Sequence, residues 1–189
     1  MTFTWDVGTF DSGATMDSIL WHPRIVHLPI ALAVIVPLVA SGVLLAWWRD
    51  WLPARSWWIA VALQGLLVTT GFAAMQTGEA DEERVEHLVP HDAVEAHEEA
   101  GEAFVWLGAG VFVLFALGGA LPKRTLQLGF ASAAVVGSLA GLAAGVSVGS
   151  KGGDLVYVHG AANAFTSSAP SGGSAPVGSA HDDDHDDDD

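Results

Sequence analysis

Residues 28–48 have the sequence LPIALAVIVPLVASGVLLAWW, an apolar run without a charged side chain. A helix needs about 20 such residues to cross roughly 30 Å of hydrocarbon, so this run is long enough to span a bilayer. Three further apolar runs follow, at residues 57–75, 103–121 and 126–149. We therefore predict an all-α membrane protein whose four transmembrane helices form a bundle.

The segments between these runs are strongly acidic. The 189 residues carry a formal net charge of -15, although 51% of them are hydrophobic. An acidic surface repels phosphates, which disfavours nucleic acid as a partner. The chain also has no nucleophile elbow, phosphate-binding glycine loop or His-Glu-x-x-His motif, which disfavours an ordinary hydrolase. The lipid bilayer is thus the first partner that the sequence indicates.

Basic residues predict the orientation in the membrane. Arg49, Arg55, Lys123 and Arg124 lie in the short segments after the first and third runs. Such loops are cytoplasmic by the positive-inside rule, so we expect both termini outside. Every histidine, and every acidic residue except Asp50, then lies on the outer side.

The three predicted regions differ in composition. Residues 1–20 form a polar outer leader, residues 21–163 the four-helix domain, and residues 164–189 a linker followed by HDDDHDDDD. Ser, Gly, Ala and Pro are typical of flexible linkers, so we expect a disordered acidic tail. Its His181, His185 and aspartates could also bind divalent cations, although without a fixed geometry.

Several local features predict where the helices end and pack. We expect the second helix to end near Gly78, and residues 78–102 to form two short amphipathic helices broken at Pro90. Residues 155–159 are expected to form an extended or turn-like piece that folds back over the mouth of the bundle. The tryptophans between residues 47 and 58 are expected to serve only as anchors at the membrane interface.

A four-residue glycine repeat lines one face of the fourth run. Its members are Gly137, Gly141, Gly145 and Gly149. Small residues let another helix backbone approach closely. The same face could admit a flat ligand, although close helix packing is the simpler interpretation.

Four histidines are expected to converge at the outer mouth of the bundle. His22 and His27 precede the first run, His97 lies six residues before the third, and His159 follows the fourth. Helical bundles commonly bind cofactors between side chains that project inward from facing helices. Cysteine is absent, so a cofactor must be held by histidine, carboxylate or methionine, or be non-covalent.

Two separated motifs carry a family resemblance. They are HPRIVHLPI at residues 22–30 and GGDLVYVHG at residues 152–160, and His97 lies between them ahead of the third run. Together they resemble the signature of a family of small bacterial four-helix membrane proteins of unknown function, over roughly residues 20–163. The resemblance implies a multi-pass protein of the bacterial inner membrane. Because relatives look like companions of, or fusions to, Rieske and cytochrome c modules, it also implies redox work with such a partner or within a larger complex.

Our leading hypothesis is an integral membrane b-type haem protein. Two of the four histidines would ligate the iron, a second haem would bind if all four pair, and Arg24 or, less readily, Arg84 would pair with the propionates. Bis-imidazole ligation leaves no open iron position and suits electron transfer. We therefore expect an electron-transfer or binding subunit rather than a stand-alone enzyme.

The residues leave two other hypotheses open. The same imidazoles could bind copper or zinc on the periplasmic side, since neutral imidazole suits both metals. Glu95, Glu98 or Asp154 would assist, with His91, His181 and His185 as weaker ligands. Alternatively, the chain is a structural subunit of a membrane complex, and its histidines are satisfied polar residues at helix ends.

Overall fold

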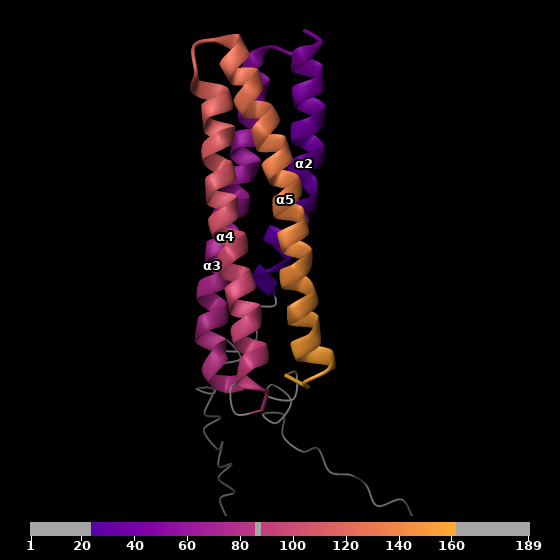
Figure 1. Cartoon of the computed structure of the whole chain (residues 1–189), viewed down its shortest axis with the longest axis vertical. Helices are drawn as coiled ribbons and strands as arrows, with labels where there is room; N and C mark the ends of the chain where they lie inside the picture. Colours follow the sequence, from indigo (N-terminus) through magenta and orange to yellow (C-terminus); the bar gives the residue numbers. More distant parts are fainter. Residues whose placement is uncertain (1–23, 86–87, 162–189) are drawn as a thin grey trace, which may run out of the picture.

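The computed structural model describes residues 24–85 and 88–161, which form one long helical bundle (Figure 1). A 3₁₀ turn, η2 (Ala54–Ser56), joins the first two helices. The four long helices of the described part are α2 (His27–Trp48), α3 (Trp57–Val85), α4 (His91–Ala120) and α5 (Arg124–Tyr157). Each is long and apolar enough to cross a membrane, which confirms the predicted four-helix bundle.

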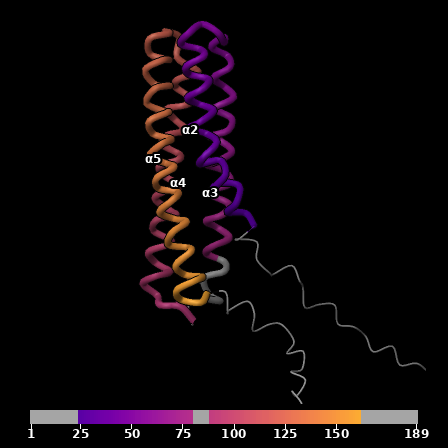
Figure 2. The backbone as a smooth tube through the Cα atoms, turned by 90° about the vertical axis from the view of Figure 1, so that its right-hand side faces the viewer, coloured from indigo at the N-terminus to yellow at the C-terminus, as the bar shows by residue number. Residues whose placement is uncertain are grey.

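The helices form a closed ring in chain order. The main contacts join α2 to α3, α3 to α4, α4 to α5, and α5 back to α2. Consequently α2 lies diagonally opposite α4, and α3 lies diagonally opposite α5. Because α2 has 22 residues and α5 has 34, α2 begins part-way along the bundle, as both views show (Figures 1 and 2).

The end of the bundle where α4 begins, which we call the outer end after the predicted orientation, differs from the prediction. Helix α3 continues through Gly78 to Val85, and α4 begins directly after Pro90, so residues 78–102 do not form separate short helices. A glycine costs a helix only about 1 kcal/mol, and the Glu, Ala and Arg residues that follow favour helix. Pro90 has a φ of -56° and lies ahead of the first turn, where the missing N–H of proline costs little.

The end of α5 also differs from the expected extended piece. The helix continues to Tyr157 and ends where Gly160 adopts a φ of 73°. This left-handed conformation lets the Ala161 N–H donate to the Leu155 carbonyl at 2.9 Å. Ala161 then packs against Val89 and Val94. The chain therefore folds back at Gly160 and Ala161, directly after the predicted residues 155–159.

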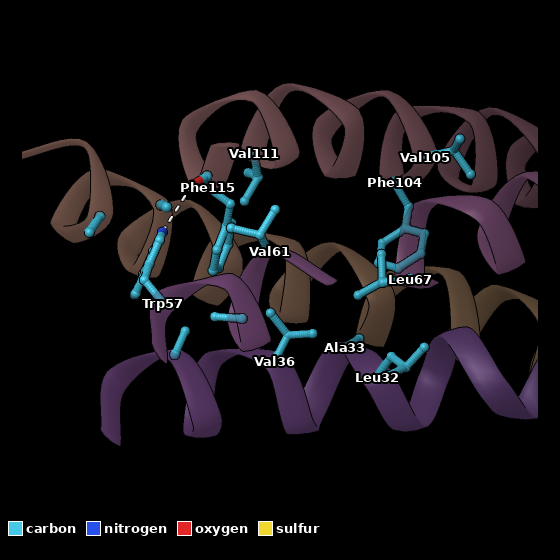
Figure 3. Packing of buried hydrophobic residues seen from close by; sticks show 14 of the residues in the cluster. Leu32, Ala33, Val36, Trp57, Val61, Leu67, Phe104, Val105, Val111 and Phe115 are labelled. Atoms are coloured by element: carbon cyan, nitrogen blue, oxygen red, sulfur yellow. Dashed lines mark hydrogen bonds between the residues drawn. The ribbon is translucent and has the colours of Figure 1, made fainter. Parts of the chain in front are cut away.

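The opposite end of the bundle, which we call the inner end after the same prediction, contains an aromatic core. Trp57 is fully buried and stacks on Phe115 with 5.2 Å between the ring centroids (Figure 3). Its Nε1–H donates to the Phe115 carbonyl at 2.9 Å. Trp47 is also buried, with its ring centroid 6.1 Å from that of Trp57. Anchoring is thus the wrong role for these two tryptophans, whereas Trp48, Trp51 and Trp58 are exposed and fit it.

The glycine face of α5 is closely packed at alternate positions. A Cβ atom on Gly137 would lie 2.8 Å from Val111 Cγ2, and one on Gly145 would lie 3.3 Å from Phe104 Cε2. At Gly141 and Gly149 a Cβ would meet no atom within 4 Å. Four residues rotate a helix by about 40° beyond a full turn, so the repeat drifts around α5. Close approach is therefore confirmed for half of the repeat.

Candidate functional site

Two of the predicted histidines lie at one level at the outer end of the bundle. Three helices meet at Gly145 of α5. A Cβ on this glycine would lie 3.3 Å from Phe104 Cε2 of α4 and 3.6 Å from Ala33 Cβ of α2, so these three residues lie at one height along the bundle. His97 lies seven residues outward from Phe104, and His27 lies six residues outward from Ala33. At 1.5 Å per residue, both are about 10 Å farther out. His27 and His97 therefore share a level on α2 and α4.

The best-defined histidine is His97, whose half-buried ring lies against the backbone of α5. A Cβ on Gly152 would lie 3.0 Å from Cε1, 3.5 Å from Nδ1 and 3.7 Å from Nε2 of His97. The Nδ1 atom is buried. A side chain at position 152 would require the imidazole to shift by a few tenths of an ångström. His97, which lies between the two motifs in the sequence, is thus in contact with Gly152, the first residue of the second motif.

The other predicted ligands lie around this contact. His27 and Arg24 are exposed at the start of α2, and that start leans away from α5 (Figure 2). His159 is half-buried and lies seven residues after Gly152. His91 is exposed and lies six residues before His97. His91 is thus about 9 Å farther out by the helical rise, whereas His159 follows the end of α5 at Tyr157, next to the turn at Gly160. His22, His181 and His185 lie outside the described residues, as do the predicted leader and tail and the side chain of Arg84.

Among the side chains that the structure describes, those of residues 24–79 and 88–161, no three His, Asp or Glu residues are grouped so that they could hold a metal ion. Glu95 and Asp154 are exposed, and Glu98 is half-buried. The described part of the chain therefore does not assemble the three or four ligands that a copper or zinc site normally has.

The helix backbones near His97 are open. A Cβ added at Gly101 on α4, or at Gly149 or Gly153 on α5, would meet no atom within 4 Å. These glycines lie within about one turn of His97 or of Gly152. Bare backbone is therefore exposed on the surfaces of α4 and α5 within about one turn of the contact between His97 and Gly152.

The contact between His97 and Gly152 yields a direct prediction. We expect Gly152→Ala to destabilise the fold, because the added Cβ would displace the imidazole; overpacking typically costs about 1–3 kcal/mol. The gain in helix propensity, about 1 kcal/mol, offsets part of this. Gly153→Ala is the matched control and should raise stability, since its Cβ meets open space. Thermal unfolding in detergent measures both, and equal melting temperatures would contradict the contact.

Gln64 is a buried polar residue that the sequence patterns did not predict. Gln64 on α3 is 2% exposed, and its Nε2 donates to the Gly108 carbonyl at 2.9 Å. Polar groups inside membrane spans are costly and often functional. A carboxamide inside the otherwise apolar run 57–75 was the signal that could have identified it.

No protein-family model, no curated protein and no solved structure matches this chain. The resemblance to the bacterial four-helix family therefore rests on the two motifs and His97, and it stays a prediction. The same holds for the redox partners that this resemblance implies.

Proposed function

We propose that this chain is a membrane subunit that binds b-type haem at the outer end of its bundle and transfers electrons. The observation that carries the proposal is the placement of His97. Its imidazole is half-buried at the level of His27, beside α5 backbone that Gly149 and Gly153 leave open. This arrangement offers one axial ligand next to a surface that could accept a porphyrin.

The number of available ligands favours haem over a bare ion. A bis-imidazole haem needs two histidines, because the porphyrin supplies the other four iron ligands. A copper or zinc site needs three or four protein ligands, and the described residues contain no such group. We assign His97 as one axial ligand and His27, at the same level, as the other.

Charged side chains near this level suit the carboxylates of haem. Arg24 is exposed three residues before His27, and the half-buried Lys151 precedes Gly152. Guanidinium and ammonium groups bind carboxylates through charge-assisted hydrogen bonds. Either cation could orient the propionates toward the outer water layer.

The distribution of charge supports an outward-facing site. The inner end of the bundle carries Arg49, Arg55, Lys123 and Arg124, next to the two short connections (Figure 1). Positively charged loops favour the cytoplasm, which would place His27 and His97 toward the periplasm of a bacterial inner membrane. A haem there would exchange electrons with an outer-side carrier such as a cytochrome c or Rieske protein.

An optical spectrum tests the proposal. The full chain is produced with a supply of haem and purified in detergent. We expect a Soret band, a pyridine haemochrome typical of protohaem, and the low-spin ferric resonance of bis-imidazole ligation. A folded preparation that shows no Soret band even after incubation with haemin would overturn the proposal. Stoichiometric copper or zinc without haem would favour the bare-ion hypothesis instead.

A further inference from the structure

A small cavity lies at the centre of the bundle, far from the histidines. Its walls include Pro37, near the midpoint of α2, together with Gln64 of α3 and Ser138 of α5. The centre of a water molecule can move within about 10 Å³ of this cavity. A buried water needs roughly 10–15 Å³ by this measure. The cavity is therefore of the size of a single water molecule.

The first polar group at this cavity is the side-chain carbonyl of Gln64. Its Oε1 is buried and accepts no hydrogen bond within the described part of the chain. The carboxamide cannot simply be reversed, because Nε2 donates to the Gly108 carbonyl and a second oxygen there would be repelled. Buried acceptors in native proteins are almost always satisfied, by protein or by ordered water. Oε1 therefore requires a donor.

Two more acceptors belong to the same walls. Ser138 is 6% exposed, and its hydroxyl donates to the Val135 carbonyl at 2.7 Å, which leaves the lone pairs of its oxygen available. Ala33 also lines the cavity. Pro37 has no N–H, so the Ala33 carbonyl lacks the donor that the fourth residue of a helix normally supplies. The cavity thus combines at least three acceptors and no spare side-chain donor.

We propose that this cavity binds one ordered water molecule. The water donates one hydrogen bond to Gln64 Oε1 and the other to Ser138 Oγ or to the Ala33 carbonyl. Purely apolar cavities of small size stay dry, but a cavity with two to four polar partners holds its water. The water links α3 to α5 or α2, so that it can join helices that lie diagonally across the ring. This site is independent of haem binding.

Solid-state NMR of the full chain in lipid bilayers tests the proposal directly. Magnetisation is transferred from water protons to the side-chain carbonyl carbon of ¹³C-labelled glutamine. The chain has only Gln64, Gln76 and Gln127, and Gln64 alone is buried. We expect a water cross peak at Gln64 despite its burial. Its absence, with Gln76 visible, would overturn the proposal.

A matched pair of serine variants locates the water. Ser138 lines the cavity, and Ser132 lines a separate groove between α2 and α5. Valine replaces the serine hydroxyl with a methyl group and adds a second methyl group. We expect Ser138→Val to reduce the Gln64 cross peak several-fold, because it removes an acceptor and narrows the cavity, and Ser132→Val to leave the peak unchanged. Equal peaks in both variants would place the water elsewhere and contradict the site.

Discussion

His97→Ala is expected to abolish haem binding while the four-helix bundle still folds. The variant removes the imidazole that lies against Gly152 of α5, and alanine leaves no group there that can ligate iron. Groups that merely orient a metal ligand are worth about 10–100-fold in affinity, so loss of the ligand itself should exceed roughly 100-fold. The measurement is haemin titration of the purified protein, followed by the Soret band.

His91→Ala is the matched control for this variant. His91 is on the same helix, six residues before His97, and its side chain is exposed. We expect its haemin affinity to stay within about a factor of two of wild type. Added imidazole should restore the low-spin spectrum of His97→Ala, because it can replace the missing ligand. Unchanged haemin binding by His97→Ala would show that His97 does not ligate the iron. The hypothesis that His97 is a structural residue would then hold.

The same titration identifies the second histidine that ligates the iron. His27→Ala should convert the low-spin spectrum to a high-spin one, because His27 shares the level of His97. His159→Ala should keep the low-spin spectrum, since His159 lies in the turn beyond the end of α5. The reverse result would assign the second ligand to the end of α5. His22→Ala extends the comparison to the first motif.

The sequence was sufficient to predict the four spans, because hydropathy reports the segment that lies in hydrocarbon. It did not predict how far the helices continue. Residues 79–85 are largely polar and still helical, because Glu, Ala and Arg favour helix in water as well. A break was expected at Gly78, where the cost of glycine is too small to end a helix that is already nucleated.

The site was only partly predictable for a geometric reason. His97 was identified from its position ahead of an apolar run, but its contact with Gly152 was not. His97 lies 23 residues before the end of α4, whereas Gly152 lies 28 residues after the start of α5. Counting outward from the connecting loop would have paired His97 with residue 147. The same offset of five residues is already present beside the loop, where Gly118 of α4 lies against Ala131 of α5. It is therefore an axial stagger between the two helices that begins at their connection, and the composition of the chain does not reveal it.

Gln64 shows a second limit of reasoning from the sequence. A single carboxamide in a span does not reveal whether it faces lipid, a partner helix or a cavity. Its meaning depends on Gly108 of α4, which accepts its hydrogen bond at 2.9 Å, and on Pro37 and Ser138 across the bundle. These residues come from four separate helices and meet only in the folded state.

Trp57→Ala is expected to cause the largest loss of stability, and Trp58→Ala a much smaller one. Trp57 is 0% exposed, stacks on Phe115 and donates to its carbonyl oxygen. Replacing a buried aromatic side chain with alanine costs about 3–5 kcal/mol. This would lower the melting temperature by about 6–20 °C for a chain of this size. Trp58 is 49% exposed, and exposed substitutions usually stay within about 0.5 kcal/mol.

This pair also decides between two roles for the tryptophans of the inner end. If they acted only as interfacial anchors, the exposed Trp58 would matter at least as much as the buried Trp57. Thermal unfolding in detergent, followed by far-ultraviolet circular dichroism, compares the two variants under identical conditions. Trp57→Phe refines the result, because it keeps a ring against Phe115 and removes the hydrogen bond to its carbonyl. Trp57→Phe should lose less stability than Trp57→Ala, because the packing of the ring is expected to contribute more stability than the hydrogen bond.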